Sequence, residues 1–308
     1  MLGSEFAKTI LGKSGAEREA LIYSAVANGH MPSWIREAEW KTILLTETIG
    51  GLPHTLKLWV LPDYFSIGTD ADFLRVPMWP ATAQKIATYL KSILPTRKIV
   101  DAIYNAADFR TSIGPPKGLD YAKMASTEAF IASNAEINTR IAGKSGLIAG
   151  GKKDLVIGPN LDGSHVAIYS TPFSGAGPVR PSDIIASDGV HHAQYQTYPS
   201  PHSADFSDYS HGLRLVFGKG ELDGKIVNLS DVFDSNLYPL VSDQGGPFLP
   251  HFPNVTGSKI GFPPKDFLPP VKPPPDEPPP VVAKASDNRA GIVIGSAIAL
   301  FLLSRIKQ

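Results

Sequence analysis

Apolar residues recur at helical spacing in three stretches of the chain. In residues 16–29 the residues Leu21, Ile22 and Val26 share one stripe, and residues 81–94 and 121–143 show similar stripes. Each stretch contains or is followed by a glycine or proline that can end a helix. A further helix is expected in "LPTRKIVDAIY", where the threonine can act as the N-cap.

Other stretches are rich in β-branched and aromatic residues. "WKTILLTET", "TLKLWVL" and "YFSIGT" are predicted as strands, with turns at Gly50-Gly51 and Pro62-Asp63. Beyond residue 143 the strand candidates are "KDLVI", "HVAIYS" and "GLRLVFG". The pattern predicts an α+β fold, with a helix-rich N-terminal part and a mixed or antiparallel β-rich C-terminal part.

The C-terminal part of the sequence differs from the rest. Residues 263–280 contain ten prolines, which favour polyproline II and cannot build a core. Residues 290–304 are fifteen residues without a charge. We therefore predict a globular domain over residues 1–255, with a subdivision near 110–145 left open. A proline-rich spacer follows over 256–289, and then a transmembrane helix over 290–306.

The apolar segment has no core of its own to join, so a membrane is the expected partner. Fifteen residues span only about 22 Å as a helix, but the flanking Arg289 and Arg305 can extend that length. A groove on a partner protein and a buried terminal helix remain alternatives. Gly291 and Gly295 form a GxxxG step, which could make a homo-oligomer. We expect the main domain on the non-cytoplasmic side of the membrane.

Composition excludes several kinds of protein and site. Basic and acidic side chains number 29 each, so the basic excess typical of a nucleic-acid binder is missing. The chain has no cysteine, which removes disulfides, thiolate nucleophiles and cysteine-ligated zinc. Two "GKSG" stretches lack the spacing of a phosphate-binding loop.

Histidines gather in the second half of the chain, and three residues there could hold a metal. His202, Asp208 and His211 could place two imidazoles and one carboxylate around Zn²⁺, which would activate a water for hydrolysis. The alternative is that the histidines bind no metal: they lie in solvent, or His211 caps the start of a buried strand through a hydrogen bond. No cofactor is the main expectation, with zinc as the alternative.

A metal-free catalytic arrangement is a second option for the stretch "DYSHGLRLV". Here His211 would be the base, Asp208 or Asp205 would orient it, and Ser203 or a distant serine would be the nucleophile. Arg214 completes the catalytic candidates His211, Asp208 and Arg214. No G-x-S-x-G elbow supports this arrangement.

The same stretch carries a distant resemblance to a known family. Ser210, His211, Gly212 and Arg214 resemble the Ser-His-Gly-Cys-x-Arg loop of the L,D-transpeptidases, which act on the peptide stem of peptidoglycan. Leu213 stands where that family has cysteine and one more residue, so the thiol is lost. The resemblance implies a non-catalytic relative, or it is accidental.

Two functions remain open from the sequence. The first is a membrane-anchored structural protein of a virion, for instance of a phage, or of a bacterial envelope, linking a membrane to a protein shell or cell wall. Its partners would be capsid or envelope proteins. The alternative is a tethered protein that binds or hydrolyses peptidoglycan with a His/Asp site. Whether the chain is an enzyme stays undecided at this point.

Overall fold

The computed structural model describes residues 1–13, 15–37, 40–111, 116, 118, 120–159, 165–173, 184–185, 191–196 and 201–250. Within these ranges the side chains of residues 121, 165–173, 184–185, 191–196 and 201–202 are not described. The chain divides into the units Met1–Pro274 and Pro275–Gln308. The second unit lies outside the described residues, and so do the predicted spacer and apolar helix.

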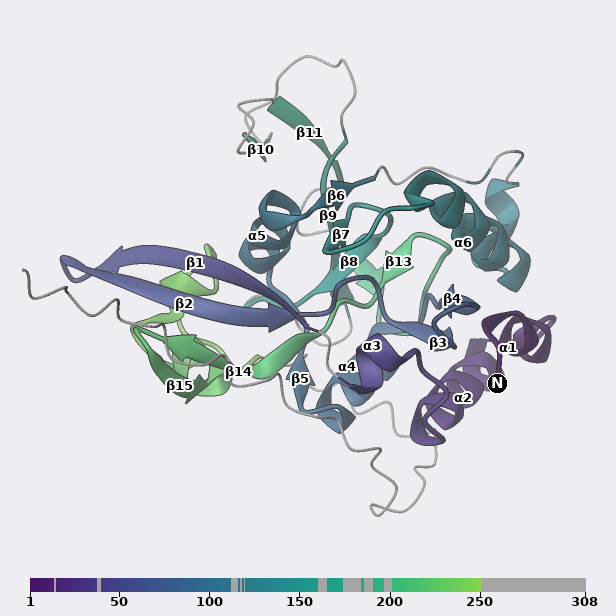
Figure 1. The fold of residues 1–308 in the computed structure, drawn as a ribbon, viewed down its shortest axis with the longest axis horizontal. Helices are drawn as coiled ribbons and strands as arrows, with labels where there is room; N and C mark the ends of the chain where they lie inside the picture. Colours follow the sequence, from purple (N-terminus) through teal and green to yellow (C-terminus); the bar gives the residue numbers. More distant parts are fainter. Residues whose placement is uncertain are drawn as a thin grey trace, which may run out of the picture. The chain divides into compact units, whose positions relative to one another are not determined.

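The described residues form a mixed α+β fold of helices and mainly antiparallel sheets (Figure 1). The helices are α1 (Gly3–Ile10), α2 (Gly15–Ala27), α3 (Ser33–Arg36), α4 (Pro80–Tyr89), α5 (Arg97–Ala106), η1 (Tyr121–Lys123), α6 (Thr127–Ile141), α7 (Leu229–Phe233) and η2 (Tyr238–Leu240). The strands are β1 (Lys41–Ile49), β2 (Leu52–Val60), β3 (Ser66–Gly68), β4 (Phe73–Arg75), β5 (Ser92–Ile93), β6 (Phe109–Arg110), β7 (Ile148–Ala149), β8 (Lys153–Val156), β9 (His165–Phe173), β10 (Ile184–Ile185), β11 (His191–Gln196), β12 (Pro201–Ser203), β13 (His211–Gly212), β14 (Val216–Leu222) and β15 (Lys225–Asn228).

The first sheet has five strands and draws on both ends of the globular unit. Its order is β1-β2-β14-β15, and β5 pairs with β14. β1 and β2 form a long hairpin closed by Gly50 and Gly51, whose φ angles of 61° and 81° suit a tight two-residue turn. Figure 1 shows this hairpin projecting from the helices, with β14 and β15 beside it.

The second sheet has six strands in the order β10-β11-β9-β8-β13, with β12 paired to β9. β13 runs parallel to β8, and the register places His211 opposite Lys153. Two small two-stranded sheets, β3-β4 and β6-β7, complete the described strands.

One large hydrophobic core joins the helices to the first sheet. It combines α1 and α2 residues such as Phe6 and Ile22 with sheet residues such as Leu58 and Val216, all fully buried. The predicted cap of α5 is confirmed, because the Thr96 hydroxyl accepts the backbone N–H of Ile99.

Three sequence predictions were wrong in their extent. The helix predicted over residues 121–143 begins only at Thr127, after the separate 3-10 helix η1, because Ser126 is its N-cap. The helix predicted over residues 81–94 ends at Tyr89, because Lys91 has a φ of 52° and Ser92–Ile93 pair with β14. The single strand predicted in "GLRLVFG" is two strands in two different sheets, β13 and β14. Among the described helices, none is long and apolar enough to cross a membrane.

Candidate functional site

Seven ionisable side chains gather in the interior and form what we call the buried polar cluster. None exposes more than 6% of its surface. Its members are Asp63, Arg75, Lys152, Asp154, Asp208, His211 and Arg214. Burying a charge is costly unless it is paired, so the contacts of each member decide what the cluster can do.

The predicted site loop is a turn that leads into β13. The Asp208 carboxylate accepts hydrogen bonds from the backbone N–H and the hydroxyl of Ser210, at 2.7 and 2.5 Å. The His211 N–H donates to the Asp208 carbonyl at 3.1 Å, and Lys153 N–H donates to the Ser210 carbonyl at 2.7 Å. The His211 ring is fully buried and meets the Phe206 ring edge to face at 5.8 Å.

These contacts decide the charge state of Asp208. Burial alone would raise the pKa of Asp208. The His211 ring, the Ser210 hydrogen bonds and the Lys153 ammonium outweigh burial, and the pKa of Asp208 lies below its usual value. Asp208 is therefore an ionised carboxylate, and its hydrogen bonds to Ser210 fix the turn.

Arg214 points to another part of the cluster. Its guanidinium donates to the carbonyls of Leu61 and Ile148, at 2.9 and 2.7 Å. It also lies over the Tyr64 ring at 4.3 Å and 3.9 Å from an oxygen of Asp154. In the described residues none of its contacts is with Asp208 or His211, so the three predicted catalytic residues do not converge on one point.

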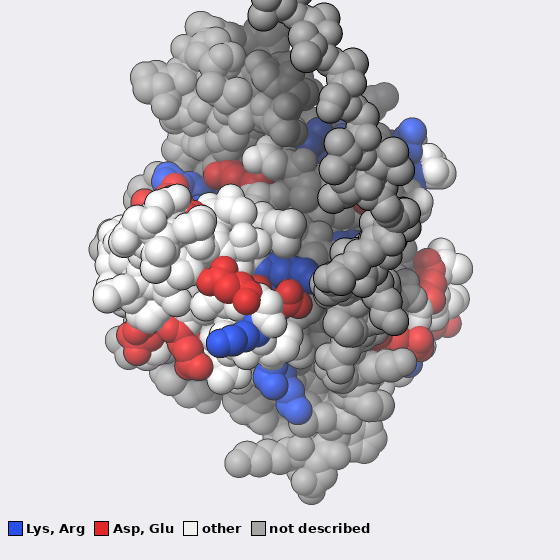
Figure 2. Space-filling view, turned by 60° about the vertical axis from the view of Figure 1, so that its left-hand side comes forward, with Lys and Arg blue, Asp and Glu red and all other residues white. Residues whose placement is uncertain are grey.

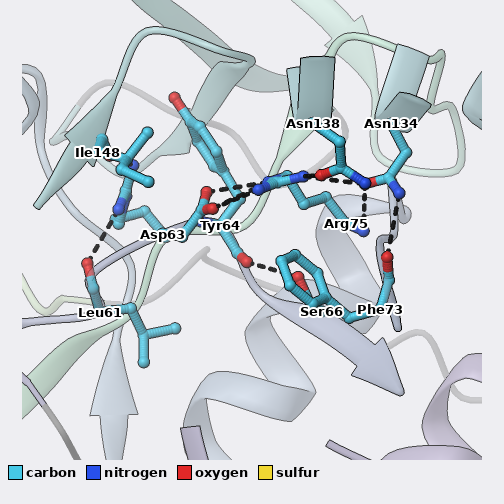
Figure 3. A network of polar contacts seen from close by, with 10 residues as sticks. Leu61, Asp63, Tyr64, Ser66, Phe73, Arg75, Asn134, Asn138 and Ile148 are labelled. Atoms are coloured by element: carbon cyan, nitrogen blue, oxygen red, sulfur yellow. Dashed lines mark hydrogen bonds and ion pairs between the residues drawn. The ribbon is translucent and has the colours of Figure 1, made fainter. Parts of the chain in front are cut away.

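The shortest ion pair of the cluster joins Asp63 to Arg75 (Figure 3). Arg75 Nη2 and Nε donate to the Asp63 carboxylate, at 2.6 Å for the shortest contact. On its other side Arg75 Nη1 donates to the side-chain oxygens of Asn134 and Asn138 in α6, at 3.1 and 2.6 Å. This arrangement ties the segment after β2 to β4 and α6.

Lys152 and Asp154 are the members with the most perturbed acidity. Burial lowers the pKa of Lys152 to about 7, and the charge of Arg75 adds to that effect. Burial raises the pKa of Asp154 to about 7, although Arg214 opposes the shift. Lys152 Nζ donates to the Tyr209 carbonyl at 2.6 Å, and the Tyr64 hydroxyl contacts Asp154 at 3.1 Å. Groups that titrate near neutral pH are suited to proton transfer, but these two are buried at 1% and 4% exposure.

Sequence reasoning did not single out Asp63, Arg75, Lys152 or Asp154 as members of a site. The available signal was a charged residue inside an otherwise apolar strand pattern, as in "DFLRVP" and "KKDLVI".

The predicted zinc ligands are only partly described. Asp208 and His211 are close in the chain, as expected, and both are buried. The backbone of His202 lies in β12 opposite Val166, but its side chain is not described. Among the described side chains no group of three or more His, Asp or Glu could hold a metal ion. The zinc site therefore stays a prediction.

Segments that lie far apart in the sequence meet in space around the buried polar cluster and α5. β8 of "GGKKDLVI" pairs with β9 of "HVAIYS" and with β13 of "DYSHGLRLV". "LPTRKIVDAIY" contacts "LYPLVSDQGGPF", because Thr96 donates to the Val241 carbonyl and Arg97 pairs with Asp243. Comparisons with protein-family models, with curated proteins and with solved structures found no match for this chain.

Proposed function

We propose that this chain is a membrane-anchored structural protein of a virion or a bacterial envelope. In this proposal residues 290–306 span the membrane, residues 256–289 are a spacer, and the globular unit contacts a protein shell or cell wall. The observation that carries the proposal is the order of the sequence: a compact unit, ten prolines within residues 263–280, and an uncharged segment over 290–304.

The geometry of the predicted site supports a structural role over a catalytic one. The His211 ring has no exposed surface, so a substrate could reach it only if the loop opened. Asp208 accepts hydrogen bonds within the turn, and Arg214 donates hydrogen bonds to two backbone carbonyls. A cavity of about 480 Å³ lies elsewhere, against β14, β15 and α7.

A flotation experiment tests the anchor. The full chain should float with phospholipid vesicles in a density gradient. A variant with Ile294→Arg and Leu300→Arg should stay at the bottom, because two buried arginines oppose insertion. Leu52→Arg, at an exposed apolar position of the globular unit, is the matched control and should float. A parent chain that stays at the bottom would overturn the proposal.

A second candidate is a tethered protein that binds or hydrolyses peptidoglycan. It is favoured by one observation, the gathering of seven ionisable side chains in the buried polar cluster, where burial brings the pKa values of Lys152 and Asp154 near 7. The test is incubation with purified peptidoglycan, with and without a chelator, followed by mass spectrometry of released muropeptides. Chelator-sensitive release would support a zinc site at His202, Asp208 and His211. Without release, a role in the wall would be limited to binding.

A further inference from the structure

β1 is an edge strand with an unprotected edge. It pairs with β2 on one side, and no described strand pairs with its other side. The pairing with β2 is continuous over Lys41–Ile49 without a bulge. Proteins commonly use prolines, bulges and inward-pointing charges to block such edges, and β1 contains no proline. Its two charges, Lys41 and Glu47, share the core-facing side of the strand with Ile43 and Leu45 but lie toward its two ends, and none lies among Thr42, Leu44 and Thr46.

The hairpin turn determines which backbone groups face the open edge. In a hairpin with a two-residue turn, the pair that flanks the turn is hydrogen-bonded, and bonded and non-bonded pairs then alternate. Thr46 therefore lies opposite Thr55 in a non-bonded pair. The hydrogen bonds between the Thr55 backbone and Asp223 confirm that Thr46 and Thr55 form a non-bonded pair, because they direct the Thr55 N–H and C=O away from β1. By the same alternation, the N–H and C=O groups of Thr42, Leu44 and Thr46 point to the open edge.

The side chains along this edge are accessible. Thr42, Leu44 and Thr46 are all exposed, and Leu44 leaves 59% of its surface in solvent. No backbone group of these three residues bonds to another described residue at the open edge. Figure 2 brings this end of the molecule forward and shows a mostly uncharged surface bordered by acidic and basic side chains.

We propose that this edge pairs with the same edge of a second copy of the chain. The two β1 strands would run antiparallel, with the two-fold axis at Leu44. Leu44 would then face Leu44 of the partner, and Thr42 would face Thr46 at both ends. These are the residues whose backbone groups point to the edge, so each facing pair exchanges two hydrogen bonds.

The side chains match in the same register. Lys41 of one copy lies opposite Glu47 of the other, which gives two opposite-charge pairs by symmetry, and Ile43 lies opposite Leu45. The Glu47 carboxylate also accepts a hydrogen bond from Lys98 Nζ of its own chain at 2.7 Å. In the dimer this carboxylate would therefore pair with Lys98 of its own chain and with Lys41 of the second copy.

The neighbouring registers match less well. A shift that centres the axis on Leu45 sets Ile43 against Glu47 and Lys41 against Ile49. A shift toward Ile43 sets Lys41 against Leu45 and breaks both threonine pairs. Only the register centred on Leu44 therefore aligns charge, hydroxyl and apolar positions together.

Cysteine cross-linking of the full chain in mild detergent tests the axis. The parent has no cysteine, so Leu44→Cys introduces a unique thiol at the point where the strands would cross. Leu52→Cys is the matched control, because Leu52 is exposed by 64% on the same hairpin but lies on β2. We expect a disulfide-linked dimer from Leu44→Cys and little from Leu52→Cys. Equal yields, or no dimer from Leu44→Cys, would overturn the proposal, and association through Gly291 and Gly295 alone would favour neither thiol.

A charge reversal tests the register by a separate measurement that needs no thiol. Lys41→Glu turns both opposite-charge pairs into repulsive ones, and we expect the dimer dissociation constant from analytical ultracentrifugation to rise about tenfold. Lys8→Glu changes the net charge equally from an exposed site on α1 and should leave the constant unchanged. An unchanged constant for Lys41→Glu, or an equal rise for Lys8→Glu, would contradict the proposed pairing.

Discussion

Replacing His211 by alanine distinguishes a structural histidine from a catalytic one. A structural His211 fills a site at the start of β13, so its removal should lower the free energy of unfolding. A catalytic His211 would be dispensable for stability. The sequence "DYSHGLRLV" alone cannot distinguish a structural His211 from a catalytic one, but the contacts of the His211 ring predict the effect of its removal on stability.

The size of the expected loss follows from burial. The His211 ring has 0% exposure and packs on Phe206 with ring centroids 5.8 Å apart. Truncating a buried aromatic side chain to alanine costs about 3–5 kcal/mol, and the smaller and more polar imidazole places the expected loss at about 2–4 kcal/mol. Asp208 would also lose the neighbouring ring that helps to keep its pKa low.

The assay is urea unfolding of a chain truncated after Pro274, followed by the fluorescence of its four tryptophans. The unfolding midpoint should fall while the slope with urea stays constant. His54→Ala is the control, because His54 contacts Asp223 at the protein surface and should change the midpoint much less. A His211→Ala chain that unfolds like its parent would refute the structural interpretation, and loss of muropeptide release from that stable variant would make His211 catalytic.

Three further changes test other parts of the fold. Burial raises the pKa of Glu19 from 4.5 to about 7, so the contribution of this one carboxyl to stability, about 3 kcal/mol, should be fully present below pH 4.5 and lost as the pH rises through 7. Glu19→Gln should remove this carboxyl's part of the pH dependence in urea titrations at acidic and mildly alkaline pH, and a pH dependence of stability equal to that of the parent chain would contradict the shift. Gly212→Ala would place a methyl group 2.5 Å from the Tyr64 ring and should cost about 1–3 kcal/mol in thermal unfolding, while Gly245→Ala, which meets nothing within 4 Å, should cost little. Thr96→Ala removes the N-cap of α5 and should cost about 1–2 kcal/mol by chemical denaturation, and a neutral result would mean that the cap is dispensable.

Local features of the fold could be predicted from the sequence because their causes are local. Gly50-Gly51 supplies the positive φ angles of the β1–β2 turn, and Thr96 supplies the cap of α5. Gly29 and Gly143 follow α2 and α6 with φ angles of 72° and 71°, as expected for residues that end helices.

The sheet arrangement could not be predicted, because it depends on contacts far apart in the chain. "GLRLVFG" has the pattern of one strand, but the backbone of Leu213 and Leu215 bonds to Phe65 and Leu61, between the two sheets. β5 exists because Ser92–Ile93 meet β14, more than 100 residues later. No local periodicity carries that information.

The candidate site was found only in part for the same reason. His211 and Asp208 stood out because histidine and aspartate in one loop are typical of catalysis. Lys152 stands beside Lys153 in the sequence and carries no local sign of burial, yet its side chain lies in the core, where the charges of Arg75 and Asp208 act on it. A buried lysine of this kind can be recognised only when the residues around it are known, and those residues lie far away in the sequence.

The buried polar cluster includes an arginine that joins the two sheets at one junction. The segments after β2 and before β14 run side by side where the chain passes from one sheet to the other, with Leu61 N–H bonded to the Leu215 carbonyl at 3.0 Å. Arg214 crosses this junction and holds the carbonyls of Leu61 and Ile148. A slip in register would leave that buried guanidinium without its acceptors, at a cost of several kcal/mol. Charged and hydrogen-bonding residues thus specify one connection between two sheets, and the same residue types, at the same short spacing, also serve catalysis elsewhere.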